Sequence, residues 1–236
     1  GDFVLKPLKD GERAIEVLPQ VAALPVTPPS AITGNDSSNA PIAGFMRHNG
    51  GWSVSFSLAD PALGISWRLG DSGEFKETGF PDTIDPRKRR RMPNPSIELP
   101  NDAPAAVIQV RYIDPTGELQ GPFPIKFDPD AALINSHRKL LDMTATSWLS
   151  FGGYNGPLVY YSQILSYRCA VREMRIGIDT TVPDKVVKLP LCNPKDPSAM
   201  PENYQPYLKI LPTTKSVSVE LTYQDGSVSE IKTFKR

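Results

Sequence analysis

Val107-Ile-Gln-Val-Arg-Tyr-Ile-Asp-Pro-Thr-Gly117 and Val217-Ser-Val-Glu-Leu-Thr-Tyr-Gln-Asp-Gly226 are two versions of one pattern. In each, apolar residues alternate with polar ones up to a tyrosine, and an aspartate and a glycine follow. Alternation of this kind indicates a half-buried strand, and the Asp/Gly ending indicates a turn. Tyr112 and Tyr223 are 111 positions apart, which is about the length of one small domain. The sequence therefore predicts two related β-domains in tandem.

The flanking residues repeat as well. Pro95-Ser-Ile-Glu-Leu-Pro100 precedes the first stretch, Pro206-Tyr-Leu-Lys-Ile-Leu-Pro212 precedes the second, and the repeats end at Phe127 and Phe234. Between them lies the one good helix candidate, which Asp128 can cap with Pro129 in the first turn. The predicted organisation has an extended Pro-rich N-terminal segment (1–44), a first β-sandwich domain (45–128), a helical linker (129–144) and a second β-sandwich domain (145–236).

A strand containing Trp67 leads into the turn Gly70-Asp-Ser-Gly73 in the first of these domains. Together with the two matching ends, this pattern resembles bacterial immunoglobulin-like or fibronectin-III-like repeats over 45–128 and 145–236. The resemblance implies an all-β fold with two tandem immunoglobulin-like β-sandwich domains joined by a short helix. Such repeats act as spacers, adhesion modules or partner-binding platforms, although a fold alone assigns no function.

Composition and motifs narrow the chemistry. With 26 basic and 26 acidic residues, the formal charge is zero, which argues against general attraction to nucleic acid or anionic membrane. No apolar run is long enough to cross a bilayer.

We expect His48 and His137 at the surface, and two histidines are too few for a His-based metal site. Gly70-Asp-Ser-Gly73 is similar to the nucleophile loop of serine proteases, whose chemistry needs a histidine base and a buried aspartate around the serine. We interpret these four residues as a β-turn. We predict no enzyme activity, cofactor or metal.

Cys169 and Cys192 both lie in the second predicted domain. They predict one disulfide, and the alternative is two buried free thiols. A disulfide implies an oxidising compartment, so we expect a periplasmic or extracellular protein whose signal or anchor has been removed.

Two stretches are candidate binding sites. Arg87, Lys88, Arg89, Arg90 and Arg91 form a run of five cations that could bind an acidic partner, or could simply be a solvated loop. Trp148, Tyr154 and Tyr160 surround a Gly-rich stretch that could form a platform for sugar rings, or could be core aromatics around a turn. The apolar run from Leu158 to Leu165 is consistent with a buried strand.

These features favour a non-enzymatic, exported interaction or structural module that binds another protein through loops or an exposed edge strand. A carbohydrate-binding module and an accessory domain of a larger envelope enzyme are the alternatives. The sequence leaves the identity of the partner and the oligomeric state open.

Overall fold

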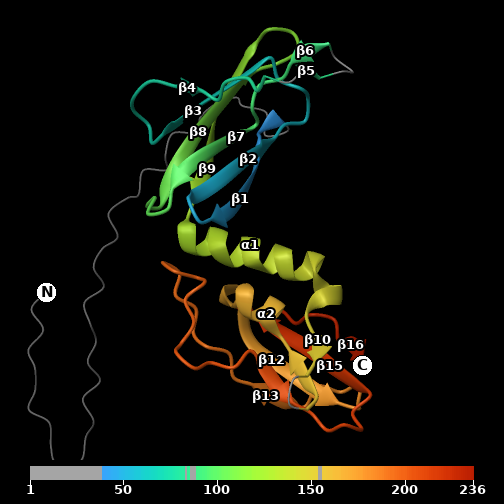
Figure 1. Cartoon of the computed structure of the whole chain (residues 1–236). Coiled ribbons are helices and arrows are strands. Elements are labelled where there is room, and N and C mark those ends of the chain that lie inside the picture. The colour runs from blue at the N-terminus through green and yellow to red at the C-terminus, as the bar shows by residue number, and fades with distance from the viewer. Residues whose placement is uncertain (1–38, 83, 86–88, 154–155) are drawn as a thin grey trace, which may run out of the picture. The chain divides into compact units, whose positions relative to one another are not determined.

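The computed structural model describes residues 39–82, 84–85, 89–153 and 156–236 (Figure 1). Strands in antiparallel sheets dominate these ranges, which confirms the prediction of a β-rich chain. The predicted N-terminal segment falls outside the described residues up to position 38. We call residues 39–128 the first half and residues 145–236 the second half.

The first half contains two larger sheets and one small hairpin. One sheet has the order β1 (Ile42–His48), β2 (Gly51–Ser57), β7 (Ser96–Pro100). The other has the order β4 (Lys76–Glu77), β3 (Gly64–Leu69), β8 (Ala106–Ile113), β9 (Leu119–Phe127). A separate hairpin pairs β5 (Ile84–Asp85) with β6 (Arg90–Arg91).

The second half has the same number of strands in its two sheets. One sheet has the order β10 (Ser150–Gly152), β11 (Leu158–Tyr160), β14 (Tyr207–Lys209). The other has the order β13 (Lys185–Val187), β12 (Val171–Ile178), β15 (Ser216–Tyr223), β16 (Lys232–Lys235). With the β5–β6 hairpin set aside, the strand order is the same in both halves: the first, second and fifth strands form one sheet, and the fourth, third, sixth and seventh form the other.

Each half has a core to which both of its larger sheets contribute. Trp52 and Val54 from β2 meet Ile108 and Val110 from β8 in one buried cluster. The other cluster contains the alternating side chains of β15, namely Val217, Val219, Leu221 and Tyr223, together with Val159 from β11. Alternate side chains of a strand point to the same face, so the period of two in the sequence places these residues together.

The predicted helix is present as α1 (Pro129–Met143), and it lies between the two halves (Figure 1). The Asp128 carboxylate accepts hydrogen bonds from the backbone N–H groups of Asp130 and Ala131, which is the expected cap. Leu133 packs in the first-half cluster and Leu141 in the second-half cluster. One rigid element therefore contributes to both cores.

The prediction of a strand from Leu158 to Leu165 is partly wrong. β11 ends at Tyr160, and the short helix α2 (Ser162–Ser166) follows it. Two short 3-10 helices, η2 (Ala145–Ser147) and η3 (Arg168–Ala170), lie nearby. Ile164 and Leu165 are buried as predicted, but from one helical turn. A short apolar run has no periodicity that distinguishes a strand from a buried helix.

The two matching tyrosines have similar structural roles. The Tyr112 hydroxyl on β8 donates to the Asn39 carbonyl oxygen at 3.0 Å, just before the first strand of its half. The Tyr223 hydroxyl on β15 donates at 2.6 Å to Oδ1 of Asp142, in the last turn of α1, the helix that leads into the second half. Burial and the Asp142 hydrogen bond raise the pKa of Tyr223. Each tyrosine therefore ties the sixth strand of its half to the segment that enters that half.

Replacing Tyr223 with phenylalanine should remove a hydrogen bond to a charged group. We expect Tyr223→Phe to lower the free energy of unfolding by about 1.5 kcal/mol, and Tyr112→Phe, which loses a bond to a neutral carbonyl, by about 1 kcal/mol. Urea unfolding followed by tryptophan fluorescence measures both. Unchanged stability in Tyr223→Phe would contradict a structural role for the bond.

Candidate interaction site

β1 is the least protected edge strand in the described part of the chain. It is seven residues long, contains no proline or lysine, and pairs only with β2 among the described strands. Its Arg47 side chain reaches away to the second half, where it donates to the carbonyl oxygens of Pro194 and Lys195 at 2.7 and 2.9 Å. The unpaired backbone groups of such an edge can pair with another chain.

The other seven end strands of the four larger sheets are short or carry residues that discourage pairing. β4, β10, β13 and β14 have two or three residues each. β9 contains Pro122 and Pro124, β16 contains Lys232 and Lys235, and β7 contains Glu98 and ends at Pro100. Proline removes a backbone donor, and a charged side chain resists burial in a new interface. This contrast sets β1 apart.

A groove of about 600 Å³ runs beside β1. Ala43 to Met46 of β1 form one wall, and residues of α1 including Leu140 and Met143 form the other. Met46 is 51% exposed and Met143 71% exposed, so apolar surface is available on both walls. The floor includes Ser53 and Ser55 of β2, which are small enough to leave room for a partner's side chains.

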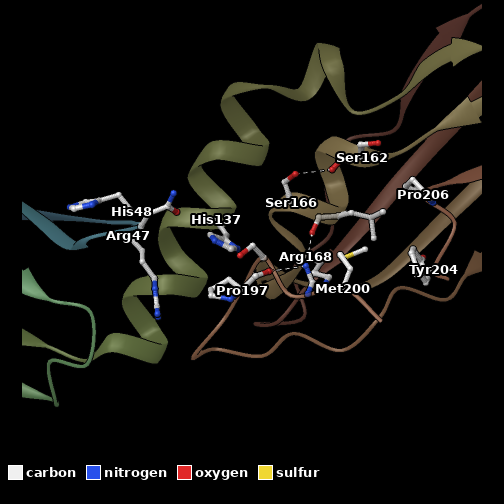
Figure 2. A pocket seen from close by; sticks show the side chains of 13 residues that line it. Arg47, His48, His137, Ser162, Ser166, Arg168, Pro197, Met200, Tyr204 and Pro206 are labelled. Carbon is white, nitrogen blue, oxygen red and sulfur yellow. Dashed lines mark hydrogen bonds between the residues drawn. The ribbon is translucent and has the colours of Figure 1, made fainter. Parts of the chain in front are cut away.

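A second cavity, of about 450 Å³, lies where the β1–β2 turn, α1, α2 and the loop before β14 meet (Figure 2). Its polar lining includes Arg47, His48, His137 and Arg168. Nothing in the sequence marks this cleft, because its residues come from four separated segments.

Arg168 organises the wall of the cleft formed by the second half. Its side chain is buried, with 2% of the residue exposed. Its guanidinium donates to the carbonyl oxygens of Leu165 at 3.1 Å and Pro197 at 2.8 Å, and also to that of Ala199. Its Nε has no hydrogen-bond partner among the described residues. Arg168 therefore holds the loop in place through backbone carbonyls, without a carboxylate in contact.

The prediction that His137 lies at the surface is wrong. Only 8% of His137 is exposed, and its ring meets the edge of the Tyr167 ring at a centroid distance of 5.3 Å. Burial lowers the pKa of His137 to about 4, and the positive charges of Arg168 and Arg47 act in the same direction. A surface position would require this face of α1 to meet solvent, whereas it packs against the second half. His48 is exposed, and its Nε2 lies 2.8 Å from Glu98 Oε2.

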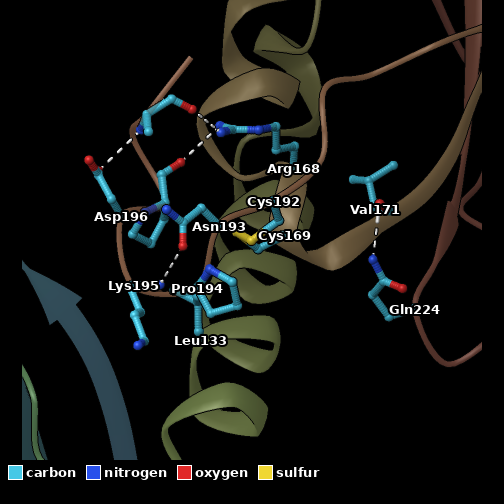
Figure 3. Close-up of a disulfide and its surroundings, with 12 residues drawn as sticks. Leu133, Arg168, Cys169, Val171, Cys192, Asn193, Pro194, Lys195, Asp196 and Gln224 are labelled. Atoms are coloured by element: carbon cyan, nitrogen blue, oxygen red, sulfur yellow. Dashed lines mark hydrogen bonds between the residues drawn. A yellow bond between two sulfur atoms is a disulfide. The ribbon is translucent and has the colours of Figure 1, made fainter. Parts of the chain in front are cut away.

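The predicted disulfide between Cys169 and Cys192 is present (Figure 3). It joins η3 to the start of a loop. In this loop the carbonyl oxygens of Pro194 and Lys195 accept hydrogen bonds from the Arg47 guanidinium. The neighbouring Arg168 holds the next part of the same loop. The bridge therefore fixes the segment through which the second half contacts the first.

The predicted basic run is only partly described. Arg87 and Lys88 lie outside the described residues, whereas Arg90 and Arg91 form β6 and Arg89 precedes it with a positive φ of 51°. Arg91 Nη2 lies 3.7 Å from Asp82 Oδ1, and both side chains are exposed. Exposed ion pairs contribute little stability, so these cations remain accessible on a solvated hairpin.

The two described aromatics of the predicted platform, Trp148 and Tyr160, do not form one exposed surface. Trp148 is 1% exposed, and its Nε1 donates to the Leu141 carbonyl oxygen at 2.9 Å, so its ring cannot stack on a bound sugar. Tyr154 lies outside the described residues. Tyr160 is half-buried and meets Tyr207 edge-on at 5.5 Å between ring centroids. The alternative interpretation, core aromatics around a turn, holds for Trp148.

Comparison of the chain with models of known protein families and with curated proteins found no match. Within the described ranges, no group of three or more His, Cys, Asp or Glu residues is placed to hold a metal ion. No helix among those residues is long and apolar enough to cross a membrane. The function of this chain must therefore be inferred from its own geometry.

The disulfide should contribute strongly to stability. Cys192→Ser removes a cross-link between residues 23 positions apart, and we expect the free energy of unfolding to fall by about 3 kcal/mol. Urea unfolding of the oxidised and reduced wild-type protein and of the variant measures this loss. Reduction should destabilise the wild type and leave Cys192→Ser unaffected; an effect of reductant on both would point to another cause.

His137 should make stability fall in mild acid. Its folded pKa of about 4 lies below the ordinary value of 6.5, so the unfolded chain binds the proton first as the pH falls. Stability should therefore drop by roughly 3 kcal/mol as the pH goes from about 6.5 to about 4. Urea unfolding against pH should show this loss in the wild type and in His48→Gln, but a much smaller one in His137→Gln. Equal slopes in all three would contradict the burial of a neutral His137.

Proposed function

We propose that this chain is an exported, non-enzymatic interaction module that binds another protein by adding one of that protein's extended segments to the edge of β1. The single observation behind the proposal is the contrast between β1 and the other end strands. Of the end strands that the structure describes, β1 alone combines length with the absence of proline and lysine, and it has an accessible groove beside it.

The proposal includes an immunoglobulin-like or fibronectin-III-like architecture, with two β-sandwich domains in tandem at 45–128 and 145–236. The identical strand order in the two halves supports it, since a repeated topology is what duplication of one unit leaves. The similar positions of Tyr112 and Tyr223 support it further. Such domains commonly bind partners at strand edges and loops.

A location in the periplasm or outside the cell is the part of the proposal that the disulfide supports. Bridges such as Cys169–Cys192 form and persist in oxidising compartments and are rare in reducing ones. The bridge anchors the loop whose Pro194 carbonyl oxygen accepts a hydrogen bond from Arg47. A reducing compartment would remove this constraint.

Strand addition explains how the groove would be used. Backbone groups of the added segment would pair with the free edge of β1, and its alternate side chains would point to opposite faces. On one face they would meet the apolar wall formed by Met46 and Met143, and on the other the first-half core near Phe45. Affinity would come from the backbone and selectivity from the side chains.

A lysine at Met46 should block such an addition. Met46→Lys places a charge beside the free edge, and we expect the recovery of a partner to fall about tenfold or more, which corresponds to about 1.4 kcal/mol. The assay immobilises the protein, exposes it to envelope extract of the native host and quantifies the bound proteins by mass spectrometry. Hydrogen exchange of the complex then reports protection of the β1 amides.

Val186→Lys is the matched control, because Val186 is 53% exposed on another edge strand, β13. It should bind as the wild type does. Recovery that survives Met46→Lys, with no added protection of β1, would overturn the edge-strand proposal. A double variant with Arg90→Gln and Arg91→Gln then tests whether the basic hairpin is the site instead.

A further inference from the structure

We propose that the cleft between the two halves is a second binding site, which takes a carboxylate group carried on an apolar body. It is separate from the β1 groove, and the proposal does not depend on strand addition. The cleft combines two arginines, one of them buried, with an apolar part of its lining.

The lining is electropositive. Its permanent charges are those of Arg47 and Arg168, and no aspartate or glutamate of the described residues lines it. His137 also lines the cleft but is neutral at pH 7, because its pKa is about 4, and His48 contacts Glu98. Neither arginine has a carboxylate within salt-bridge distance among the described residues, since both donate to backbone carbonyls. The Asp196 carboxylate, which accepts from Ser198 and from the backbone of residue 199, acts on Arg168 without forming a salt bridge: it raises the pKa of Arg168, although burial lowers that pKa overall.

Burial makes this charge costly. Arg168 is almost fully buried, and its Nε has no partner. A buried ion is ordinarily compensated by a counter-ion as well as by hydrogen bonds. Carbonyl dipoles and the more distant Asp196 charge supply only part of that compensation, since burial still lowers the pKa of Arg168, so an anion in the cleft would stabilise Arg168 by supplying the rest.

His137, on α1, is also affected by the positive charges of the two arginines. It is more than nine-tenths buried, and its Nδ1 has no hydrogen-bond partner. Both Arg168 and Arg47 disfavour its protonation, which places the two charges within electrostatic reach of one ring. A bound anion would oppose those charges and favour the protonated ring.

The remaining lining defines the rest of the ligand. Leu165, Met200 and Pro206 offer apolar contacts, and Ser162 and Asn49 are polar. A volume of about 450 Å³ suits a small ligand or the end of a peptide. Because the arginines already use several N–H groups on carbonyls, a carboxylate with two oxygens fits better than a phosphate with three.

The test uses the full chain and three probes: hexanoate, N-acetyl-leucyl-leucine with a free carboxylate, and the same peptide as its amide. NMR follows the imidazole signals of His137 during a pH titration with and without each probe. We expect at least one carboxylate to raise the pKa of His137 by about 0.5 unit or more, and the amide to leave it unchanged. Binding of hexanoate alone identifies a free organic acid, and binding of the peptide acid identifies a chain terminus.

The variants locate the site. Arg47→Gln should weaken carboxylate binding about tenfold or more. Arg172→Gln removes an exposed arginine of β12 that does not line the cleft, and it should have no effect. Equal binding of acid and amide, no change of His137 with any probe, or the same loss in both variants would overturn the proposal. The probe titration of the wild type remains decisive if Arg47→Gln does not fold.

Discussion

Packing of α1 into both cores is the interaction on which the rest of the described structure depends. Leu133, near the start of the helix, belongs to the first-half core, and Leu141, near its end, belongs to the second-half core. A helix is stiff over this length, whereas a Gly/Ser-rich linker is flexible. Both halves therefore share one rigid element, and the cleft between them has a defined lining.

The disulfide and the two arginines complete this arrangement from the other side. Cys169–Cys192 anchors one end of the loop, Arg168 holds its middle through carbonyl oxygens, and Arg47 reaches it from β1. Each arginine is satisfied mainly by backbone dipoles. Carbonyls fix a guanidinium in place without cancelling its charge, so the interactions that join the halves also make the cleft electropositive.

The two candidate sites share β1 but use different parts of it. Ala43 to Met46 line the groove, whereas Arg47 and His48 at the end of the strand line the cleft. Among the end strands of the described residues, β1 is the long one without proline, lysine or glutamate. An exposed strand edge promotes aggregation, so such an edge is ordinarily blocked. An exposed edge beside an apolar groove is a feature of binding surfaces.

Local patterns in the sequence determined the strands around Tyr112 and Tyr223 and the capped helix after Asp128, because alternation and capping act over short distances. The sequence also determined the disulfide, because two cysteines allow one pairing. Only the tertiary structure decided that His137 and Trp148 are buried and that Arg47 and Arg168 line one cleft. Those outcomes depend on which face of α1 meets the second half and on where a loop nearly 150 positions away from Arg47 is anchored. No periodicity in the sequence encodes that docking, since it arises from contacts between segments that are distant in the chain.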